Sequence, residues 1–544
     1  MSNNKKAKTS NKALRYPHTA TEVLCSEIWS IVETCINAQD TLLVPFWESM
    51  LDRSPDEIKP QLLMAGRFAR VNAVFMNKKP HEMIQFIRSQ PRVIQQLLAH
   101  IEIPSFMDLL IRIIQMDELD SSVIEWLSSQ NLLQTLLNYL SPEFPPDIHT
   151  AAAEMIKNII ALSTQGPGDG ISTNQIPPSN RFARELAAEQ SIQTLSTYIL
   201  REFSAPVPSS GEDPRRLQTP TFESSTSSVT NSLSVLIELV RKNNSDYFEP
   251  YLFHTLRNRL ISIQQSTLGP QDPEGSRETL EKAMKSLTCR MGVVHLGPLL
   301  RITSSHMELL VKYLQSPRSQ PPTPLPTTHG PLTRLTFERF RICELIAELL
   351  HCSNMALLNR PRKVNEELYD EWGRLKGGLT GLEELARAMT FGNSGSNETE
   401  PPGGVESPST PGEGNGGFTV RAAAVAAAAA AEDEDMSDED TEPTSSDDEM
   451  VEIAMEDEKQ QQQQQTTGIA ASPSSGPPSR RTSRALSLAP ISPPEDTLNA
   501  SSPYGEKAEE EELVIGETLK ACLLKVDVLN VLLACFTLHS SRLN

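Results

Sequence analysis

Apolar side chains recur at helical spacing along residues 19–163. They return every three or four positions, which is the period of one face of an α-helix. Alternating runs of β-branched residues between tight turns do not occur in this stretch, so strands are not expected. The pattern therefore predicts an all-α region. Its clearest faces are Ile103/Met107/Leu110/Ile114, Leu132/Leu133/Leu136/Leu137/Leu140 and Met155/Ile156/Ile159/Ile160.

Helix-start signals divide this region into short helices of about 9–16 residues. In the stretch KKPHEMIQFIRSQPRVIQQLLAHIEIPSFMDLL, Pro80 and Pro91 mark helix starts and Pro104 marks a helix boundary. Glu82 follows Pro80 in the first turn, where it meets the positive end of the helix. These signals predict many short helices that are joined by short connections.

Isolated helices of this length are marginal in water, so each must bury its apolar face against its neighbours. Stacked antiparallel helices meet this need, and we predict an armadillo/HEAT-like irregular helical array with long disordered insertions. The sequence has no clear period of 34 or about 42 residues. A compact irregular helical bundle therefore stays open as the alternative.

Composition divides the chain into further segments. Residues 1–15 are expected to be a disordered basic start and residues 16–390 the array. Residues 391–512 read as a disordered acidic insertion, and 513–538 as terminal helices of the array. Loop insertions inside the array are expected at about residues 165–180, 204–221, 266–276 and 316–331.

The net charge of −21 lies almost entirely in one segment. Residues 391–512 hold 26 acidic and 6 basic residues, which accounts for nearly all of that charge. Because the array is almost neutral, its charge does not predict nucleic-acid binding. We expect a protein partner and no nucleic acid.

The seven cysteines are odd in number and show no CxxC spacing, so free thiols in a reducing compartment are expected. The start of the chain is basic and has no apolar signal segment. The apolar run near the C-terminus contains Lys520, Lys525 and Asp527, which argues against a membrane span. These features predict a cytoplasmic or nuclear protein.

The sequence carries no catalytic motif. His81-Glu82 begins like a HExxH zinc-protease helix, but Gln85 stands where the second histidine would be. The ten histidines show no metal-ligand spacing, and no GxSxG elbow or kinase signature is present. We therefore expect no enzyme, no cofactor and no metal site.

The charged faces of two predicted helices are candidates for partner contacts. The stretch FERFRICELIAELL combines an apolar face of Phe337, Phe340, Leu345, Ile346 and Leu349 with a charged face. A merely solvated face is the alternative for most of these charges. The candidate partner-binding residues are Asp108, Arg112, Arg339, Arg341, Glu344 and Glu348.

Serines in the acidic insertion lie in kinase-like contexts. Ser437, Ser445 and Ser446 precede acidic residues, Ser483 follows Arg480-Arg481-Thr482, and Ser492 precedes a proline. Phosphate would add about −1.5 to −2 charge at each site. Unmodified solvating residues are the alternative reading. The insertion is thus expected to be a region that phosphorylation can tune.

Long stretches of the chain resemble one family. Four stretches are similar to the SAPS family: YPHTATEVLCSEIWSIVETC, KKPHEMIQFIRSQP, HIEIPSFMDLLIRII and RFRICELIAELLHCSN. Their sequences resemble the fungal branch of that family. The resemblance implies an armadillo-like fold and a regulatory subunit that binds the catalytic subunit of a type-2A-like Ser/Thr protein phosphatase. It also allows further regulatory subunits in the same complex.

Both ends of the chain depart from the family pattern. A short basic start stands where the family has an acidic leader, and the chain stops at Asn544 before the family's Trp-Asn-Asn helix. Truncation at both ends is therefore expected. The resulting functional hypothesis is a regulatory scaffold that modulates phosphatase activity or substrate choice. The alternative is a general helical-repeat adaptor without a phosphatase partner.

Overall fold

The computed structural model describes residues 15–164, 177–203, 213, 215–267, 273–318, 325–327, 330–332, 335–392 and 514–537. All of them belong to one compact unit, which comprises residues 1–407 and 512–544. A second unit, residues 408–511, lies outside the described residues. The predicted phosphorylation sites and most of the predicted acidic insertion fall there.

The described residues are almost all helical, as the apolar periodicity predicts. Residues 15–24 form a first helix. The next elements are α2 (Trp29–Asn37), α3 (Gln39–Leu51), α4 (Pro55–Ile58), η1 (Lys59–Gln61), α5 (Leu62–Lys78), α6 (Pro80–Ser89), α7 (Val93–Ala99), α8 (Pro104–Gln115), η2 (Met116–Glu118), α9 (Val123–Ser129), α10 (Leu132–Tyr139) and α11 (Pro146–Ser163).

The later elements are α12 (Arg181–Ala187), α13 (Glu189–Leu200), α14 (Phe222–Lys242), α15 (Ser245–Thr267), α16 (Pro273–Arg290), α17 (Gly297–Ser305), α18 (Met307–Gln315), β1 (Leu325–Thr327), β2 (Gly330–Leu332), α19 (Phe337–Cys352), α20 (Ala356–Asn359), α21 (Arg362–Leu368), α22 (Leu379–Gly392), α24 (Ile515–Lys525) and α25 (Val528–Thr537).

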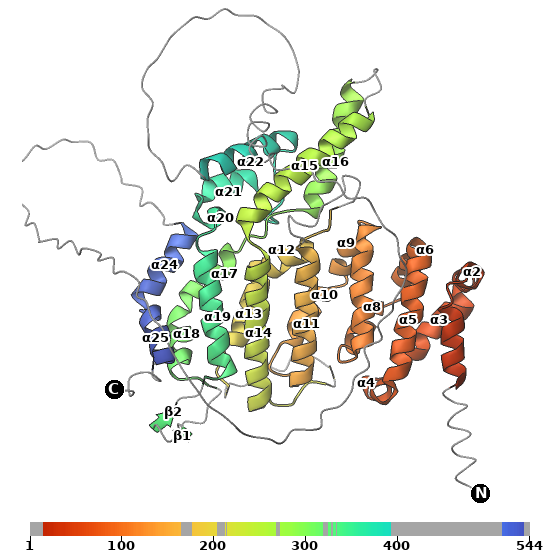
Figure 1. Ribbon diagram of the computed structural model, residues 1–544, viewed down its shortest axis with the longest axis horizontal. Coiled ribbons are helices and arrows are strands. Elements are labelled where there is room, and N and C mark those ends of the chain that lie inside the picture. Colours follow the sequence, from red (N-terminus) through yellow and green to blue (C-terminus); the bar gives the residue numbers. More distant parts are fainter. Residues whose placement is uncertain are drawn as a thin grey trace, which may run out of the picture. The chain divides into compact units, whose positions relative to one another are not determined.

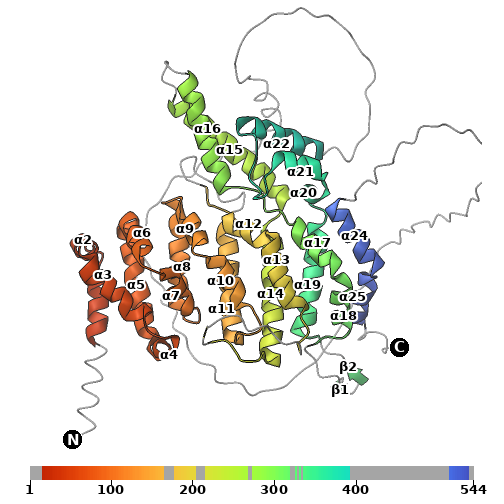
Figure 2. The ribbon, with the colours of Figure 1, turned by 180° about the vertical axis from the view of Figure 1, so that it is seen from behind.

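The long helices form a row in chain order. Helix α5 contacts α8, α8 contacts α11, α11 contacts α14, and α14 contacts α19, so that they stand side by side (Figure 1). Helices α7, α10, α13 and α17 form a second row by the same kind of contact, which is seen from behind in Figure 2. The all-α fold class is therefore confirmed. The finer assignment to an armadillo/HEAT-like repeat stays a prediction.

One strand pair corrects the sequence reading. The antiparallel hairpin β1–β2, in which Leu325 pairs with Leu332, begins inside the segment expected as a loop at 316–331 and ends one residue beyond it. A pair of three-residue strands leaves no room for an alternating pattern, and the prolines that indicated a loop lie inside it. The hairpin therefore gave no strand signal in the sequence.

The start signals predicted for the short helices are confirmed at Pro80 and Pro104, which open α6 and α8. The prediction that Pro91 opens a helix is wrong by two residues, because α7 begins at Val93. Arg92 adopts a left-handed conformation with φ 54°, and Asn131 does the same with φ 57° before α10. Each left-handed residue directly precedes the first residue of its helix and so separates that helix from the one before it.

The core is continuous along the rows, from Val32 near the N-terminus to Val528 in α25. Helices α24 and α25 pack on the unit although the sequence places them after the long insertion. Helix α24 contacts α17 and α20, and the Cys522 thiol donates to the Ser304 carbonyl at 3.3 Å. The terminal apolar residues are thus part of this core.

A second hydrophobic core lies beside the first, and the apolar periodicity did not predict it. Helices α15, α16, α21 and α22 supply most of its buried side chains. Leu357 of α20 and residues just outside these helices, such as Met291 and Leu375, supply the rest. Glu249, Arg360 and Tyr369 form a buried polar cluster there, in which Tyr369 donates to Glu249 at 2.7 Å. The expected array of residues 16–390 therefore contains two cores.

Part of the expected loop at 204–221 is anchored to the array. The guanidinium of Arg215 donates to the Ala99 carbonyl and to the Tyr139 hydroxyl, both at 2.8 Å. Arg216 pairs with Glu143 and lies over the ring of Phe144. These contacts fix the chain just before α14 begins.

Candidate partner-binding surface

A groove between α5 and α8 contains two of the predicted partner-binding residues. Its volume is about 260 Å³ and its lining includes Asp108 and Arg112. Aromatic packing beneath it sets the spacing of the two helices, because the rings of Phe68 and Phe106 meet edge to face at 5.8 Å. Small residues of α5, such as Gly66, leave the space open.

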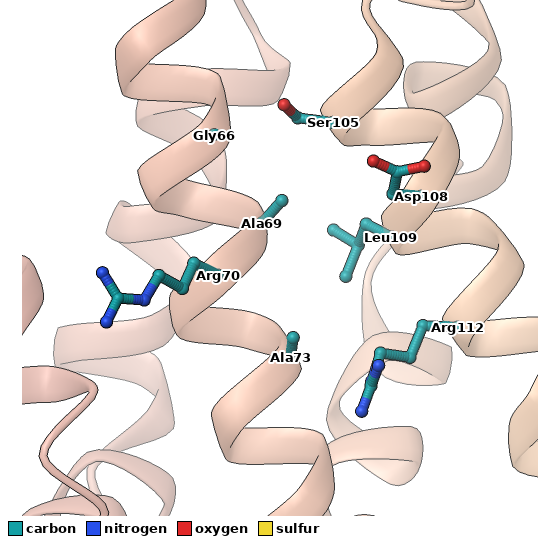
Figure 3. A pocket seen from close by; sticks show the side chains of 8 residues that line it. All are labelled: Gly66, Ala69, Arg70, Ala73, Ser105, Asp108, Leu109 and Arg112. Atoms are coloured by element: carbon teal, nitrogen blue, oxygen red, sulfur yellow. The ribbon is translucent and has the colours of Figure 1, made fainter. Parts of the chain in front are cut away.

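Figure 3 shows the lining of this groove. Ala69 and Leu109 point toward one another across it, Ser105 is directed toward Gly66, and Arg70 turns away from α8. The floor is therefore apolar and the rim is polar. Such a groove accommodates a protein segment that brings both apolar and charged groups.

The two predicted charges on its rim differ in their partners. Arg112 donates to the side-chain oxygen of Asn77 on α5 at 2.7 Å, which links the two helices. Asp108 is exposed one turn earlier and makes no ion pair or side-chain hydrogen bond with any described residue. Its carboxylate is therefore open to a cationic group of a partner.

Three other predicted residues form a charge cluster on α19. Glu344 accepts from Arg341 and from Arg241 of α14, each at 2.7 Å, and Glu348 accepts from Arg241 at 2.7 Å. Partial burial raises the pKa of Glu344, but both arginines lower it, and the net shift is downward. The ion pairs therefore hold the side chains of this cluster in place.

Arg339 lies elsewhere than the sequence suggested. Its side chain is only 4% exposed and donates to the Leu314 carbonyl at 2.8 Å. This contact joins α19 to the end of α18 and leaves little of the guanidinium at the surface. We therefore assign Arg339 a structural position and omit it from the proposed contact surface.

The expected apolar face of α19 is wrong at its first turn. Phe337 is 79% exposed and Phe340 is 47% exposed, whereas Leu345, Ile346 and Leu349 are buried as predicted. The buried face follows Ile342 rather than the phenylalanines, which lie on other sides of the helix. Sequence reasoning placed these rings in the core because it counted apolar residues without their angular positions.

The residues that the structure describes hold no cluster suited to a metal ion. Within those ranges no three His, Cys, Asp or Glu side chains lie close enough to hold a metal ion. His81 and Glu82 lie at the start of α6, where a backbone hydrogen bond is the main factor that lowers the pKa of Glu82. No described helix is long and apolar enough to cross a membrane.

The predicted phosphorylation sites lie outside the described residues. They are Ser437, Ser445, Ser446, Ser483 and Ser492. They remain predictions.

Several curated proteins are similar to this chain. Extragenic suppressor of kinetochore protein 1 from Schizosaccharomyces pombe is 36% identical over 349 residues, covering 64% of this chain and 35% of that protein. The SIT4-associating protein SAP185 from Saccharomyces cerevisiae is 29% identical over 349 residues, covering 64% and 27%. No solved structure gives a significant match.

A human protein is similar at lower identity. Serine/threonine-protein phosphatase 6 regulatory subunit 1 from Homo sapiens is 27% identical over 269 residues, covering 47% of this chain and 29% of that protein. The chain thus spans about a third of the length of the relatives it matches. The higher identity to the two yeast proteins agrees with the resemblance of this sequence to the fungal branch of the family.

A family model supports the same grouping. The model for SAPS, described as SIT4 phosphatase-associated protein, matches residues 72–540, which is most of the chain. The match includes the second helical row, both predicted contact regions and the two terminal helices. This chain belongs to the SAPS family of SIT4 phosphatase-associated proteins.

Proposed function

We propose that this chain is a non-enzymatic regulatory subunit that binds the catalytic subunit of a type-2A-like Ser/Thr protein phosphatase. Membership of the SAPS family carries the proposal. Two relatives point to the partner, since one is named for association with SIT4 and another as a regulatory subunit of protein phosphatase 6. In this reading the subunit scaffolds the phosphatase and modulates its activity or substrate choice.

The row of long helices supports a scaffold role because two of its helices carry charged side chains, all of which except Asp108 are held by hydrogen bonds or ion pairs. Asp108 and Arg112 lie on α8, and Arg341, Glu344 and Glu348 lie on α19. Preorganised side chains reduce the entropy that association costs. We assign the phosphatase contacts to these two regions.

The test is direct binding of the full chain to recombinant protein phosphatase 6 catalytic subunit, measured by biolayer interferometry. The full chain purified from cells should also carry okadaic-acid-sensitive phosphatase activity above a mock purification. Absence of both binding and activity would contradict the proposal and favour a general helical adaptor.

Charge-reversal variants locate the contact. Asp108→Lys with Arg112→Glu, and separately Glu344→Lys with Glu348→Lys, should each weaken binding about tenfold, or about 1.4 kcal/mol. Arg277→Glu is the control, because this arginine forms an exposed ion pair with Glu281 on α16, away from both regions. The first double variant leaves the net charge unchanged, so a loss that it shows and Arg277→Glu does not cannot come from overall charge. Equal losses at all three places would contradict the assignment of the contact to these two regions.

The acidic insertion and the location of the protein complete the proposal. We infer that residues 391–512 regulate access to the phosphatase through phosphorylation, since added phosphate changes local charge. We further propose a cytoplasmic and nuclear location. Phosphosite mapping and fluorescence microscopy of the tagged chain test these two points.

A further inference from the structure

The turn from Asp370 to Arg374 presents a tryptophan to solvent. The side chain of Trp372 is 51% exposed, although the turn itself packs against the second core through Tyr369 and Leu375. Single exposed apolar side chains are common in soluble proteins and need no explanation by themselves. What distinguishes this tryptophan is the way its backbone is held.

The turn is fixed from within by one aspartate. The Asp370 carboxylate accepts from the backbone N–H groups of Trp372 and Arg374, both at 2.9 Å, and from the Arg374 guanidinium at 2.7 Å. The N–H of Gly373 donates to the Asp370 carbonyl at 2.9 Å. Gly373 has φ +70°, a conformation that favours glycine.

Residues far away in the sequence fix the same turn from outside. The Trp372 carbonyl accepts from the Arg184 guanidinium of α12 at 2.8 Å, and the Gly373 carbonyl accepts from the Val293 N–H at 2.8 Å. A Cβ atom on Gly292 would lie 2.6 Å from the Gly373 oxygen, so the two backbones approach as closely as glycine permits. The turn is clamped on both sides of Trp372.

Arg184 is an unusual group to place in this role. It is buried, and its hydrogen bonds go to the Asn180 amide oxygen and to backbone carbonyls rather than to a carboxylate. Burial is the main cause that lowers its pKa to about 10. Burying a cation without an anionic partner costs stability. A surface turn can form without such a buried arginine, so the cost indicates that this turn has to be held in place.

An exposed aromatic side chain on a fixed backbone is the kind of residue that dominates protein–protein binding. Tryptophan is enriched among binding hot spots, and a ring carried on a fixed backbone loses less conformational entropy on association than one on a mobile loop. Next to it, the Glu371 side chain is exposed and makes no ion pair with any described residue. The tip of the turn therefore offers one large ring flanked by one free negative charge.

We propose that Trp372 is an anchor residue for the phosphatase catalytic subunit, where it enters an apolar pocket whose rim carries a cationic side chain opposite Glu371. This inference rests on the proposed function and adds a third contact region to it. Asp370 and Arg184 act as positioning residues, because they hold the backbone that carries the ring.

The experiment compares variants of the full chain in binding to recombinant protein phosphatase 6 catalytic subunit. Trp372→Ala should raise the Kd at least tenfold, Trp372→Phe should raise it less, and Glu371→Lys should lower the association rate. Trp29→Ala is the matched control, because that ring is 53% exposed and is covered by Lys79 at 4.1 Å. Its Kd should stay within twofold of the wild type.

A second variant tests the positioning role. Asp370→Ala should increase the rate of hydrogen exchange of the 370–374 amides and lower the association rate. As a folding control, the thermal unfolding temperature of Trp372→Ala should equal that of the wild type. Faster exchange in Asp370→Ala with an unchanged association rate would overturn the role of the rigid turn. Because the Trp372 ring is exposed and belongs to neither hydrophobic core, its substitution should leave the fold intact.

The outcomes separate the two proposals. Wild-type chain that fails to bind the catalytic subunit would overturn the proposed function together with this inference. Wild-type chain that binds, with Trp372→Ala binding equally well, would overturn the inference alone. If Trp372→Ala and Trp29→Ala both lower the affinity tenfold, the loss is not specific to Trp372, and the inference is likewise overturned.

Discussion

The Arg290 guanidinium donates to the Asp117 carboxylate at 2.6 Å, across 173 positions of the sequence. Both side chains are almost completely buried, at 7% and 8% exposure. Arg290 also donates to the carbonyls of Pro177 and Ser121. This ion pair ties the end of α16 to the turn after α8, and so ties the second core to the row of long helices.

Removal of one partner of this pair should destabilise the fold strongly. Asp117→Asn leaves the buried Arg290 cation without its counter-charge, and we expect a loss of about 3–5 kcal/mol. The measurement is urea unfolding followed by circular dichroism. The double variant Asp117→Leu with Arg290→Met should lose much less than Asp117→Asn, because no buried charge remains; a similar loss would show that the ion pair is not the cause.

Mild acid should destabilise the protein through His149. This histidine is fully buried, and desolvation, only partly opposed by its 2.8 Å hydrogen bond to the Ser141 carbonyl, lowers its pKa to about 4. Because the unfolded state binds a proton near pH 6.5 and the folded state does not, this contribution is complete above pH 6.5. It is lost progressively as the pH falls toward 4.

The size of this effect follows from the difference in pKa. Between pH 7 and pH 5 the wild type should lose about 2 kcal/mol through His149, out of about 3 kcal/mol for the whole shift. Urea unfolding at both pH values measures it. His149→Gln, which does not titrate in this range, should lose correspondingly less; equal losses would assign the acid sensitivity to other groups.

A β-branched residue at Asn131 should destabilise the junction before α10. Its φ of 57° lies in the left-handed region, which asparagine tolerates and valine does not. We expect Asn131→Val to cost about 1–2 kcal/mol in thermal or urea unfolding. Gln134→Val, at an exposed position inside α10, is the control and should cost only about 0.5 kcal/mol.

A methyl group at Gly516 should loosen the terminal helices. A Cβ there would lie 2.4 Å from the Ser353 carbonyl oxygen and 2.5 Å from the Asn359 side-chain oxygen. In Gly516→Ala, hydrogen exchange should become faster in residues 515–537 and stay unchanged in residues 62–163. Such a pattern would show local undocking, whereas uniform acceleration would indicate global destabilisation.

Gly66→Ala provides the contrasting substitution. The nearest heavy atom to its added Cβ is the Ser105 hydroxyl at 3.6 Å, an ordinary contact. Since alanine favours a helix interior over glycine, this variant should be at least as stable as the wild type. Any loss comparable to that of Gly516→Ala would contradict the geometric explanation.

The sequence by itself determined the helices, because their signals are local. The apolar spacing of Leu132, Leu136 and Leu140 and the prolines at α6 and α8 each act within a few residues. The family was also recognisable from continuous stretches of sequence. Asp108 and Arg112 could be proposed as contact residues because a charged helix position is visible in the pattern.

Only the tertiary structure decided which residues meet. It buried Arg339, exposed Phe337 and Phe340, joined Arg241 to Glu344 and Glu348, and built a second core from α15, α16, α21 and α22. Such contacts depend on the angular position of each helix and on chain segments about a hundred residues apart. No local pattern encodes them, because the same amphipathic helix can bury its face against many different neighbours.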